Sequence, residues 1–441
     1  MKPVKFYLVT DTHYFENSLG AEGKAFDEYM SKEQYFMKES GAIVKATFES
    51  IAKDEETDIV IIPGDLTKNG ELKSHKSFIK ELYRLKERGK KVFIITAGHD
   101  YGNSFAFRED KRIEVEGASF DALTELYKDF GYGDALAIDE ATHSYMAQIA
   151  DGVRMLAICC DSAEQPKGAM DERHIAWAKE QLDKAAADGC SVFAICHYPI
   201  IPSVPVFDLV GDAKIKEWRK IATFLADNGV ELVLTGHMHI QSINEFRSQN
   251  GNRLIDVCTS CLPGCPAKYR KITVNENSLL RIESFDIGEF GWDMNGLSVK
   301  EYCYNQFRNA IIVRVLNALK GGKGIVKQLK KIGTRIVTDC TVGTLGKFLL
   351  IKVPAELKKK KLTDMIGEIG VSIFLGDMPY TEGTPEYEVI NRFLNKFSFI
   401  IKNIEPKLSK NGVDINLTDM LLNTIGSRKP YSDNNAEFIL K

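Results

Sequence analysis

Short runs of apolar residues alternate with amphipathic segments through the first two thirds of the chain. Residues 59–62 are four β-branched apolar residues stopped by Pro63 and Gly64, a pattern that predicts a buried strand. Similar apolar runs predict further strands, at residues 6–10, 91–96, 191–196 and 230–235. Segments with helical spacing of apolar residues lie at residues 41–54, 71–89, 171–187 and 214–228. This alternation predicts a layered α/β domain.

The pattern changes after about Gly288. Before Gly288, the remaining segments have patterns that predict helix and loop at residues 104–140. They predict strands at residues 144–149, 153–159, 254–257 and 278–285. Beyond Gly288 the periodic segments all have helical spacing, at residues 299–319, 325–337, 362–375, 386–404 and 416–425. We therefore expect a first domain at residues 1–288 and a mostly α-helical second domain at residues 289–441.

Length and composition agree with this division. A chain of 441 residues is too long for one ordinary core, and 44% hydrophobic with 27% charged residues is typical of a soluble globular protein. The net charge of −3 argues against general nucleic-acid binding. From Gly291 onward the chain has 23 Lys and Arg against 15 Asp and Glu, so the predicted helical domain is basic. The lysine run at residues 358–361 is typical of a solvated helix face.

We expect no targeting segment. Its first residues contain no apolar signal core, and it has no run of about 18 apolar residues, so we expect no transmembrane segment. The nine cysteines are an odd number, and Cys159, Cys160, Cys190 and Cys196 lie in or beside apolar strand-like segments. Reduced cysteines in a cytoplasm are the better interpretation.

Potential metal ligands follow the predicted strands. They are Asp11 and His13, Asp65, His99 and Asp100, His197, and His237 and His239. A single such Asp or His is more often a turn residue, a helix cap or a structural histidine. The repetition changes this interpretation, because five of the eight histidines fall at strand ends, and ligands bind at the carboxyl ends of strands in α/β sheets.

The chemistry of this set suits two metal ions held close together. Carboxylate oxygen with imidazole nitrogen fits Fe, Mn, Zn or Co rather than Ca. Asp65 has two oxygens and could bridge both ions. Two such ions typically clamp a phosphoryl group and generate a hydroxide nucleophile at neutral pH. His99, with Asp100 beside it, could protonate the leaving oxygen as a catalytic acid.

The ordered motifs resemble those of the calcineurin-like metallophosphoesterases. The family pattern D-x-H, G-D, G-N-H-[DE], H, G-H-x-H corresponds here to Asp11-Thr12-His13, Gly64-Asp65, Ala97-Gly98-His99-Asp100, His197 and Gly236-His237-Met238-His239. The resemblance implies a four-layer α-β-β-α sandwich and a metal-dependent phosphoesterase with two Mn, Fe or Zn ions.

The resemblance also implies a role for each site residue. Asp11, His13, Asp65 and His239 would hold one ion. Asp65, His197 and His237 would hold the other, and His99 would contact the substrate phosphate. The substrate would be a small-molecule phosphodiester or phosphomonoester.

One position departs from the family pattern. The Asn that normally ligates the second metal is Gly98 here, and Gly has no side chain to offer. Asn103, water or the substrate could complete the ligand shell. The alternative is a catalytically impaired family member that binds a ligand or partner protein.

Two further features leave alternatives open. Residues 64–71 resemble the corresponding loop of class III cyclic nucleotide phosphodiesterase-like bacterial members, which points to a cyclic nucleotide substrate. Cys258, Cys261 and Cys265 could ligate zinc or an iron–sulfur cluster, but no fourth Cys is near, and structural zinc usually takes four ligands. A nuclease is disfavoured by the acidic first part of the chain.

Overall fold

The protein is built around two β-sheets. The computed structural model describes residues 1–161, 167–319, 324–408 and 415–441. The first sheet has the strand order β15 (Ala436–Ile439), β14 (Leu279–Asp286), β13 (Lys268–Val274), β1 (Val4–Leu8), β2 (Ile59–Pro63) and β3 (Lys91–Ile95). Strands β1, β2 and β3 run parallel, and β13, β14 and β15 extend the sheet through antiparallel pairs.

The second sheet is also mixed. Its strand order is β11 (Ser242–Arg247), β12 (Arg253–Cys258), β10 (Leu232–Thr235), β9 (Ser191–Cys196), β8 (Val153–Ile158), β7 (Ser144–Ala150) and β6 (Ala137–Asp139). The four strands β12, β10, β9 and β8 are parallel neighbours. Parallel strands place their carboxyl ends along one edge, so the loops that follow them meet there.

The main core lies between the sheets. All five residues of β2 are buried, which explains why its sequence is a continuous apolar run rather than an alternating one. Phe6 of β1 and Phe193 of β9 stack across the interface with ring centroids 5.1 Å apart. The two sheets are therefore joined by apolar packing.

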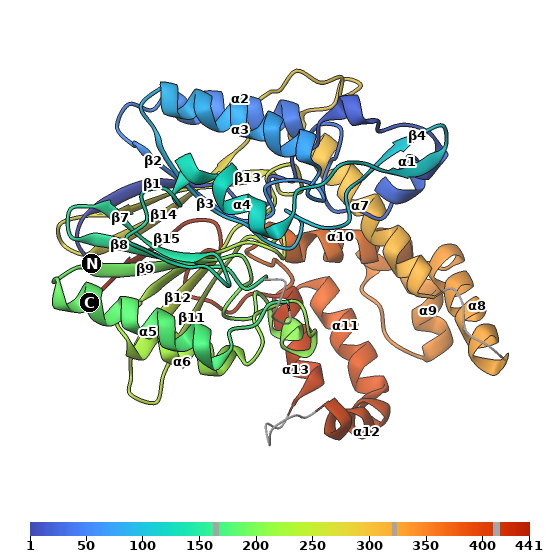
Figure 1. Ribbon diagram of the computed structural model, residues 1–441. Helices are drawn as coiled ribbons and strands as arrows, with labels where there is room; N and C mark the ends of the chain where they lie inside the picture. The colour runs from blue at the N-terminus through green and yellow to red at the C-terminus, as the bar shows by residue number, and fades with distance from the viewer. Residues whose placement is uncertain (162–166, 320–323, 409–414) are drawn as a thin grey trace.

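Helices cover the two outer faces. Figure 1 shows α2 (Ser40–Ala52) and α3 (Leu72–Glu87) on one side of the sheets, and α5 (Glu172–Ala187) and α6 (Trp218–Asp227) on the other. Buried apolar residues of α2 and α3 join the main core, and those of α5 and α6 form a second cluster with β8 and β9. The predicted α/β fold is confirmed, with four layers in the order helix, sheet, sheet, helix.

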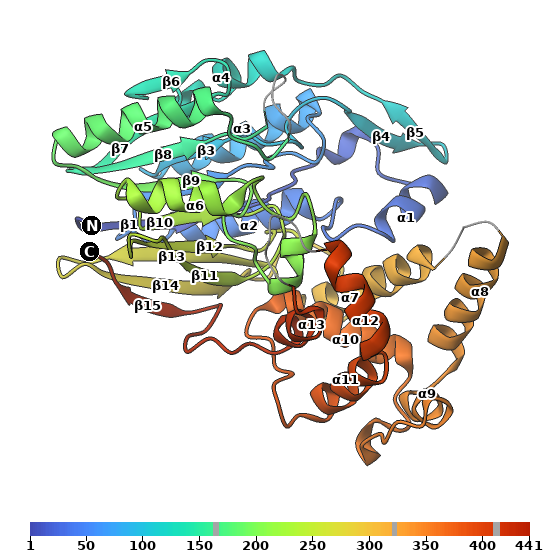
Figure 2. The same cartoon turned by 90° about the horizontal axis from the view of Figure 1, so that it is seen from below.

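A helical region follows β14. It comprises α7 (Val299–Ala318), α8 (Gly324–Asp339), α9 (Val342–Leu349), α10 (Leu362–Leu375), α11 (Pro385–Lys396), α12 (Ser398–Leu408) and α13 (Leu417–Ile425). Figure 2 shows these helices at the end of the sandwich away from the two termini. The predicted helical character of this region is confirmed. Within the described ranges, no helix is long and apolar enough to cross a membrane.

Several elements differ from prediction. Residues 386–404 form two helices, α11 and α12, with Phe397 between them. Apolar spacing continues through Phe397, so periodicity could not show the break. Residues 104–140 contain, besides the short helix α4 (Leu123–Leu126), the hairpin of β4 (Phe105–Arg108) and β5 (Lys111–Glu114), which was not predicted.

The last strand brings the chain back to the first sheet. Strand β15 pairs with β14, and Phe438 lies opposite Leu280. The segment after residue 288 therefore contains the helices α7–α13 and then one strand of the α/β sandwich. The division of the chain into domains at residues 288 and 289 stays a prediction.

Candidate metal centre

All six predicted metal ligands lie just after the carboxyl ends of four strands. Asp11 and His13 follow β1, and Asp65 follows β2. The second sheet contributes His197 after β9, and His237 and His239 after β10. Five of the six are buried, and His237 is half-buried. The two sheets thus bring residues that are up to 228 positions apart to one site.

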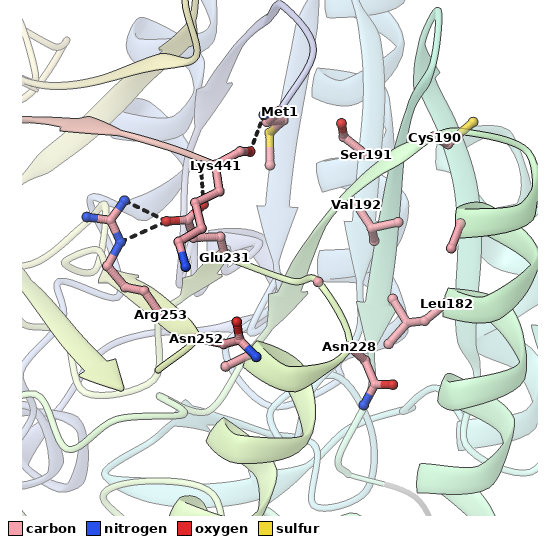
Figure 3. A pocket seen from close by; sticks show the side chains of 13 residues that line it. Met1, Leu182, Cys190, Ser191, Val192, Asn228, Glu231, Asn252, Arg253 and Lys441 are labelled. Carbon is pink, nitrogen blue, oxygen red and sulfur yellow. Dashed lines mark hydrogen bonds and ion pairs between the residues drawn. The ribbon is translucent and has the colours of Figure 1, made fainter. Parts of the chain in front are cut away.

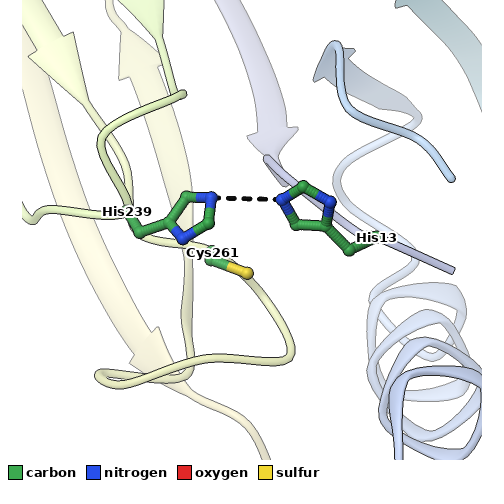
Figure 4. A group of neighbouring side chains, drawn as sticks. All are labelled: His13, His239 and Cys261. Carbon is green, nitrogen blue, oxygen red and sulfur yellow. Dashed lines mark hydrogen bonds between the residues drawn. The ribbon is translucent and has the colours of Figure 1, made fainter. Parts of the chain in front are cut away.

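The first ligand group is formed by His13, His239, Asp11 and Asp65. The rings of His13 and His239 face each other (Figure 4), and their Nε2 atoms lie 3.1 Å apart. The His239 Nε2 is 3.4 Å from Asp11 Oδ1, and the His13 Nε2 is 3.8 Å from Asp65 Oδ2. Two imidazole nitrogens and two carboxylate oxygens therefore converge on one small volume.

The second ligand group shares Asp65 with the first. The Nε2 atom of His197 lies 3.1 Å from Asp65 Oδ2 and 3.3 Å from the Nδ1 atom of His237. The ligand atoms of Asp65, His197 and His237 all lie within 4.8 Å of one another. Asp11, His13 and Asp65 meet the same criterion. Asp65 is therefore placed to bridge two ions.

Backbone carbonyls orient two of the histidines. His197 donates from Nδ1 to the carbonyl of Pro63 at 3.0 Å, which leaves Nε2 turned toward Asp65. His237 donates from Nε2 to the carbonyl of Asp212 at 2.7 Å, which leaves Nδ1 as its ligand atom. Such a bond to the far nitrogen fixes the tautomer and the ring orientation that a metal requires.

The local electrostatics favour ligand-competent forms at His13, His237 and Asp65, whereas at His197 burial acts to lower the pKa but Asp65 and Asp11 raise it well above its usual value. Burial lowers the pKa of His13 well below its usual value, and partial burial lowers that of His237 to about 4, so both rings are neutral. Burial acts to raise the pKa of Asp65, but His197 and His99 hold it well below its usual value. A neutral imidazole and an ionised carboxylate are the forms that bind metal.

Gly64 and Gly236 allow the loops that carry the ligands to approach one another closely. Gly64 has a φ of +92°, and a Cβ there would lie 2.8 Å from the Cβ of Ala97 and 2.9 Å from Nδ1 of His197. A Cβ on Gly236 would collide with the carboxylate of Asp11. The Gly-Asp and Gly-His pairs in the sequence are thus required by packing at the site.

His99 lies beside the two ligand groups. Its backbone N–H donates to Asp65 Oδ1 at 3.1 Å, and its ring packs edge-on against His13 with centroids 5.0 Å apart. The Nδ1 atom lies 2.7 Å from the carbonyl oxygen of Lys68 and donates to it. Nε2 is then the nitrogen that a substrate can reach.

Asp100 lies behind His99 and is fully buried. Its Oδ1 accepts the N–H of Thr67 at 2.9 Å, and its Oδ2 accepts the N–H of Ala97 at 2.8 Å. Burial and then the charge of Asp65 raise its pKa to about 8. Both oxygens join the loops after β2 and β3, so this placement favours a positioning role over the catalytic role expected from the sequence.

A cavity of about 840 Å³ opens beside the second ligand group. Its lining includes Asp65, His99, His197 and His237. Asn103, considered above as a substitute ligand, also lines it but is exposed. A different cavity of about 280 Å³, shown in Figure 3, lies at the amino ends of β9 and β10 and contains none of the predicted ligands.

Asp161 is a cavity residue that sequence reasoning missed. It follows β8, is 1% exposed, and its carboxylate lies directly in front of Gly98 in the cavity lining. Its pKa is raised, chiefly by burial. Its position at a strand end was the available signal, but it belongs to none of the motifs that drew attention to the other residues.

The three clustered cysteines do not form a metal group of their own in the described ranges. The Cys258 thiol donates to the carbonyl of Gly236, and the Cys261 thiol donates to that of Asp11. Cys261 alone lies near a ligand group, beside His13 and His239. Burial raises the pKa of Cys261 well above its usual value, which agrees with the thiol that donates to the Asp11 carbonyl.

The donor set fits a pair of transition-metal ions. The two facing Nε2 atoms of His13 and His239 can share at most one proton, whereas one cation between them would satisfy both lone pairs. Mixed oxygen and nitrogen donors, without thiolate, are suited to Mn, Fe and Zn. The residues present are consistent with a dimetal site.

Solved structures that match part of this chain include two phosphatases and a nucleotidase. A dimetal phosphatase from Danio rerio is 12% identical, with 65% of this chain and 98% of that chain covered and a TM-score of 0.46. A purple acid phosphatase from yellow lupin is 13% identical, with 66% and 53% covered and a TM-score of 0.41. The NAD nucleotidase of Haemophilus influenzae is 12% identical, with 78% and 62% covered and a TM-score of 0.35.

Comparison with curated proteins gives no match. The family model described as calcineurin-like phosphoesterase matches residues 4–241, which is more than half of the chain. The matched segment contains both ligand groups, His99 and the loops that carry them. The chain belongs to the calcineurin-like phosphoesterase family.

Proposed function

We propose that the protein is a dinuclear metal-dependent phosphoester hydrolase. The observation that carries this proposal is the shared carboxylate: Asp65 lies within 4.8 Å of the ligand atoms of Asp11 and His13 on one side and of His197 and His237 on the other. One group would comprise Asp11, His13, Asp65 and His239. The other would include Asp65, His197 and His237.

The residues of the site would have different roles in the reaction. When bound, two such ions polarise phosphoryl oxygens and activate a water molecule at neutral pH. Asp65 keeps the two ion sites at a fixed separation, and His197 and His237 are oriented by backbone carbonyls. His99 donates from Nδ1 to the Lys68 carbonyl, so only its doubly protonated form has a proton on Nε2, and that form would pass this proton to the leaving oxygen.

The cavity supports an anionic substrate with a flat or apolar part. Arg112 and Lys167 supply positive charge at its rim, and Tyr101, Phe105 and Tyr198 supply aromatic surface. A nucleotide phosphodiester or monoester, including a cyclic nucleotide, has both properties. The volume of about 840 Å³ is within the range of small-molecule sites.

Only part of the loop at residues 64–71, whose resemblance pointed to a cyclic nucleotide, lines the cavity. Asn69 lines the cavity, whereas Lys68 and Glu71 are fully buried with their charged groups 3.8 Å apart. The loop supports the substrate proposal through Asn69. We also propose a cytoplasmic location, because all nine cysteines are free.

Metal content and hydrolysis measured together test the function. Protein purified without chelators should contain nearly two Mn, Fe or Zn ions per chain by elemental analysis and should hydrolyse bis-p-nitrophenyl phosphate. Removal of the ions with EDTA should abolish turnover, and added Mn²⁺ should restore it. Asp65→Asn should lower both metal content and turnover, the latter by about 100-fold or more.

Asp58→Asn is the matched control. Asp58 is exposed and lies at the other end of the Asp65 strand, so this variant should keep wild-type metal content and turnover. Absence of hydrolysis on phosphodiesters, phosphomonoesters and cyclic nucleotides by protein with two ions would contradict the proposal. That result would favour a binding protein of the same family.

A further inference from the structure

The second ligand group has one donor fewer than the first. Asp65, His197 and His237 contribute one carboxylate and two imidazoles, whereas the first group has four side chains around it. Gly98 lies next to this group in the cavity lining and offers no side-chain donor. A fourth donor, if this chain supplies one, must come from another element.

The space in front of Gly98 is filled by a carboxylate. A Cβ built on Gly98 would lie 3.3 Å from Oδ2 of Asp161 and 3.2 Å from Nζ of Lys167. The first distance is shorter than most van der Waals contacts of a Cβ, so a larger side chain at position 98 would have to displace Asp161. Gly98 and Asp161 therefore fit each other.

One oxygen of Asp161 is held in place. The Tyr198 hydroxyl donates to Oδ1 at 3.1 Å, and the Tyr101 hydroxyl donates to the backbone carbonyl of the same residue at 3.1 Å. Tyr198 directly follows the ligand His197, and its ring lies 4.2 Å from the ring of His237. The residue that anchors Asp161 thus packs against the second ligand group.

The other oxygen has no partner among the described residues. The Oδ2 atom of Asp161 is buried and accepts no hydrogen bond there, although the side chain lines the same cavity as Asp65, His197 and His237. Burial of an unpaired carboxylate oxygen is unfavourable unless a cation or a donor satisfies it. A metal ion bound in this cavity within reach of that oxygen would do so.

We propose that Asp161 is a ligand of the second metal ion and that Gly98 makes room for it. The inference rests on the proposed function, because it assumes two ions. The second ion would then have a bridging carboxylate, a terminal carboxylate and two imidazoles, a mixed set suited to Mn, Fe or Zn. The catalytic centre would therefore be complete without a side chain at position 98.

Mn²⁺ binding to chelator-stripped protein tests this inference without relying on turnover. Isothermal titration of the wild type should give two sites per chain. Asp161→Ala should weaken one site by about 100-fold and leave the other unchanged, because loss of even an outer-shell partner weakens metal binding 10- to 100-fold. Asp161→Asn keeps the shape of the side chain, and it should weaken the same site even if the Ala variant fails to fold.

Position 98 supplies a reciprocal test. Gly98→Asn alone should weaken the second site, because the new amide displaces Asp161. The double variant Gly98→Asn/Asp161→Ala should recover part of the lost affinity, to within about 10-fold of wild type. Asp151→Ala, which alters an exposed carboxylate at the other end of the same strand, should change neither site.

The outcomes separate this inference from the proposed function. Two sites of wild-type affinity in Asp161→Ala or Asp161→Asn would overturn the inference alone and would leave Asp161 as a partner of Lys167. Fewer than two Mn²⁺ ions bound by the wild type would overturn both. Selective loss of one site in the Asp161 variants, with recovery in the double variant, would establish Asp161 as the ligand.

Discussion

Five of the six candidate ligands have a backbone conformation that is unfavourable for their residue type. Asp11, His13, Asp65, His237 and His239 have φ values between +36° and +65°. Each such residue stores about 1–3 kcal/mol of strain, which persists only when surrounding contacts impose it. The contacts include a bond from the His13 N–H to the Asp65 carbonyl at 3.0 Å. The strained positions coincide with the proposed ligands, as expected for a site whose ligands lie on loops.

Gly64→Ala tests whether close packing around the site is required. The new Cβ would meet both Ala97 and His197, so we expect the free energy of unfolding to fall by about 3 kcal/mol or more, with loss of bound metal. Gly89→Ala is the control: its φ of +82° is similar, but nothing lies within 4 Å of a Cβ there. It should lose only about 1–2 kcal/mol. Equal losses in urea unfolding would contradict the packing argument.

For single residues, the sequence predicted which residue types lie at the site, but not how each side chain is oriented. The six ligand candidates could be located because Asp and His recur at strand ends. Asp100 was placed in the catalytic centre because it adjoins His99, and a sequence does not reveal that both its oxygens face backbone amides. Asp161 was missed because it stands alone.

A few partly buried charged side chains join individual helices and strands. Asp54, just after α2, accepts hydrogen bonds from Tyr7 of β1 at 2.6 Å and from Lys271 of β13 at 2.7 Å. It thereby joins a helix to two antiparallel strands of the first sheet. Burial acts to raise the pKa of Asp54, but the bonds from Lys271 and Tyr7 hold it well below its usual value.

The lowered pKa of Asp54 predicts a pH dependence of stability. Because the folded state binds the proton less tightly than the unfolded state, the stabilisation is present above the unfolded pKa of about 3.9 and is lost as pH falls toward the folded pKa. Asp54→Asn should therefore be less stable than wild type at pH 7, and the difference should shrink below about pH 4. Asp58→Asn, on an exposed carboxylate, should show no such trend in urea unfolding. A constant difference from pH 7 to pH 3 would contradict this assignment.

The predicted elements agree with the structure where local periodicity decides them. The strand at residues 191–196 and the helix that ends at Ala187 have the expected bounds. Strands β4, β5, β6, β11, β13 and β15 were not predicted. Their pairing depends on partners rather than on a pattern of their own, and β15 pairs with a strand about 150 residues earlier.

The helical region and the sandwich share one hydrophobic core. Tyr302 and Phe307 of α7 and Val371 of α10 belong to the same buried cluster as the strands of both sheets. The Asp433 carboxylate, beyond α13, accepts the N–H of Ile243 in β11 at 2.9 Å. These contacts predict that the two parts unfold together.

Phe307→Ala tests this coupling. The side chain is 1% exposed and packs against Phe374 with ring centroids 4.9 Å apart, so the substitution should cost about 3–5 kcal/mol. Far-UV circular dichroism and the intrinsic fluorescence of the three tryptophans, of which Trp177 and Trp218 lie in the sandwich helices, should both show one transition at the same lowered temperature. Phe348→Ala, at a position 79% exposed, should change stability by less than about 0.5 kcal/mol. Two separated transitions would instead support independent domains.

The position of β15 has a consequence for how the protein is made. A ribosome releases β14 first, then the helices α7–α13, and only afterwards the strand that pairs with β14. At roughly 5–20 residues per second, the roughly 150 intervening residues take about 8–30 s to synthesise. During that interval one edge of the first sheet is without its final neighbour, and such an edge is a site for pairing with other chains. The nascent sandwich is therefore most exposed to misassembly while its helical region is being translated.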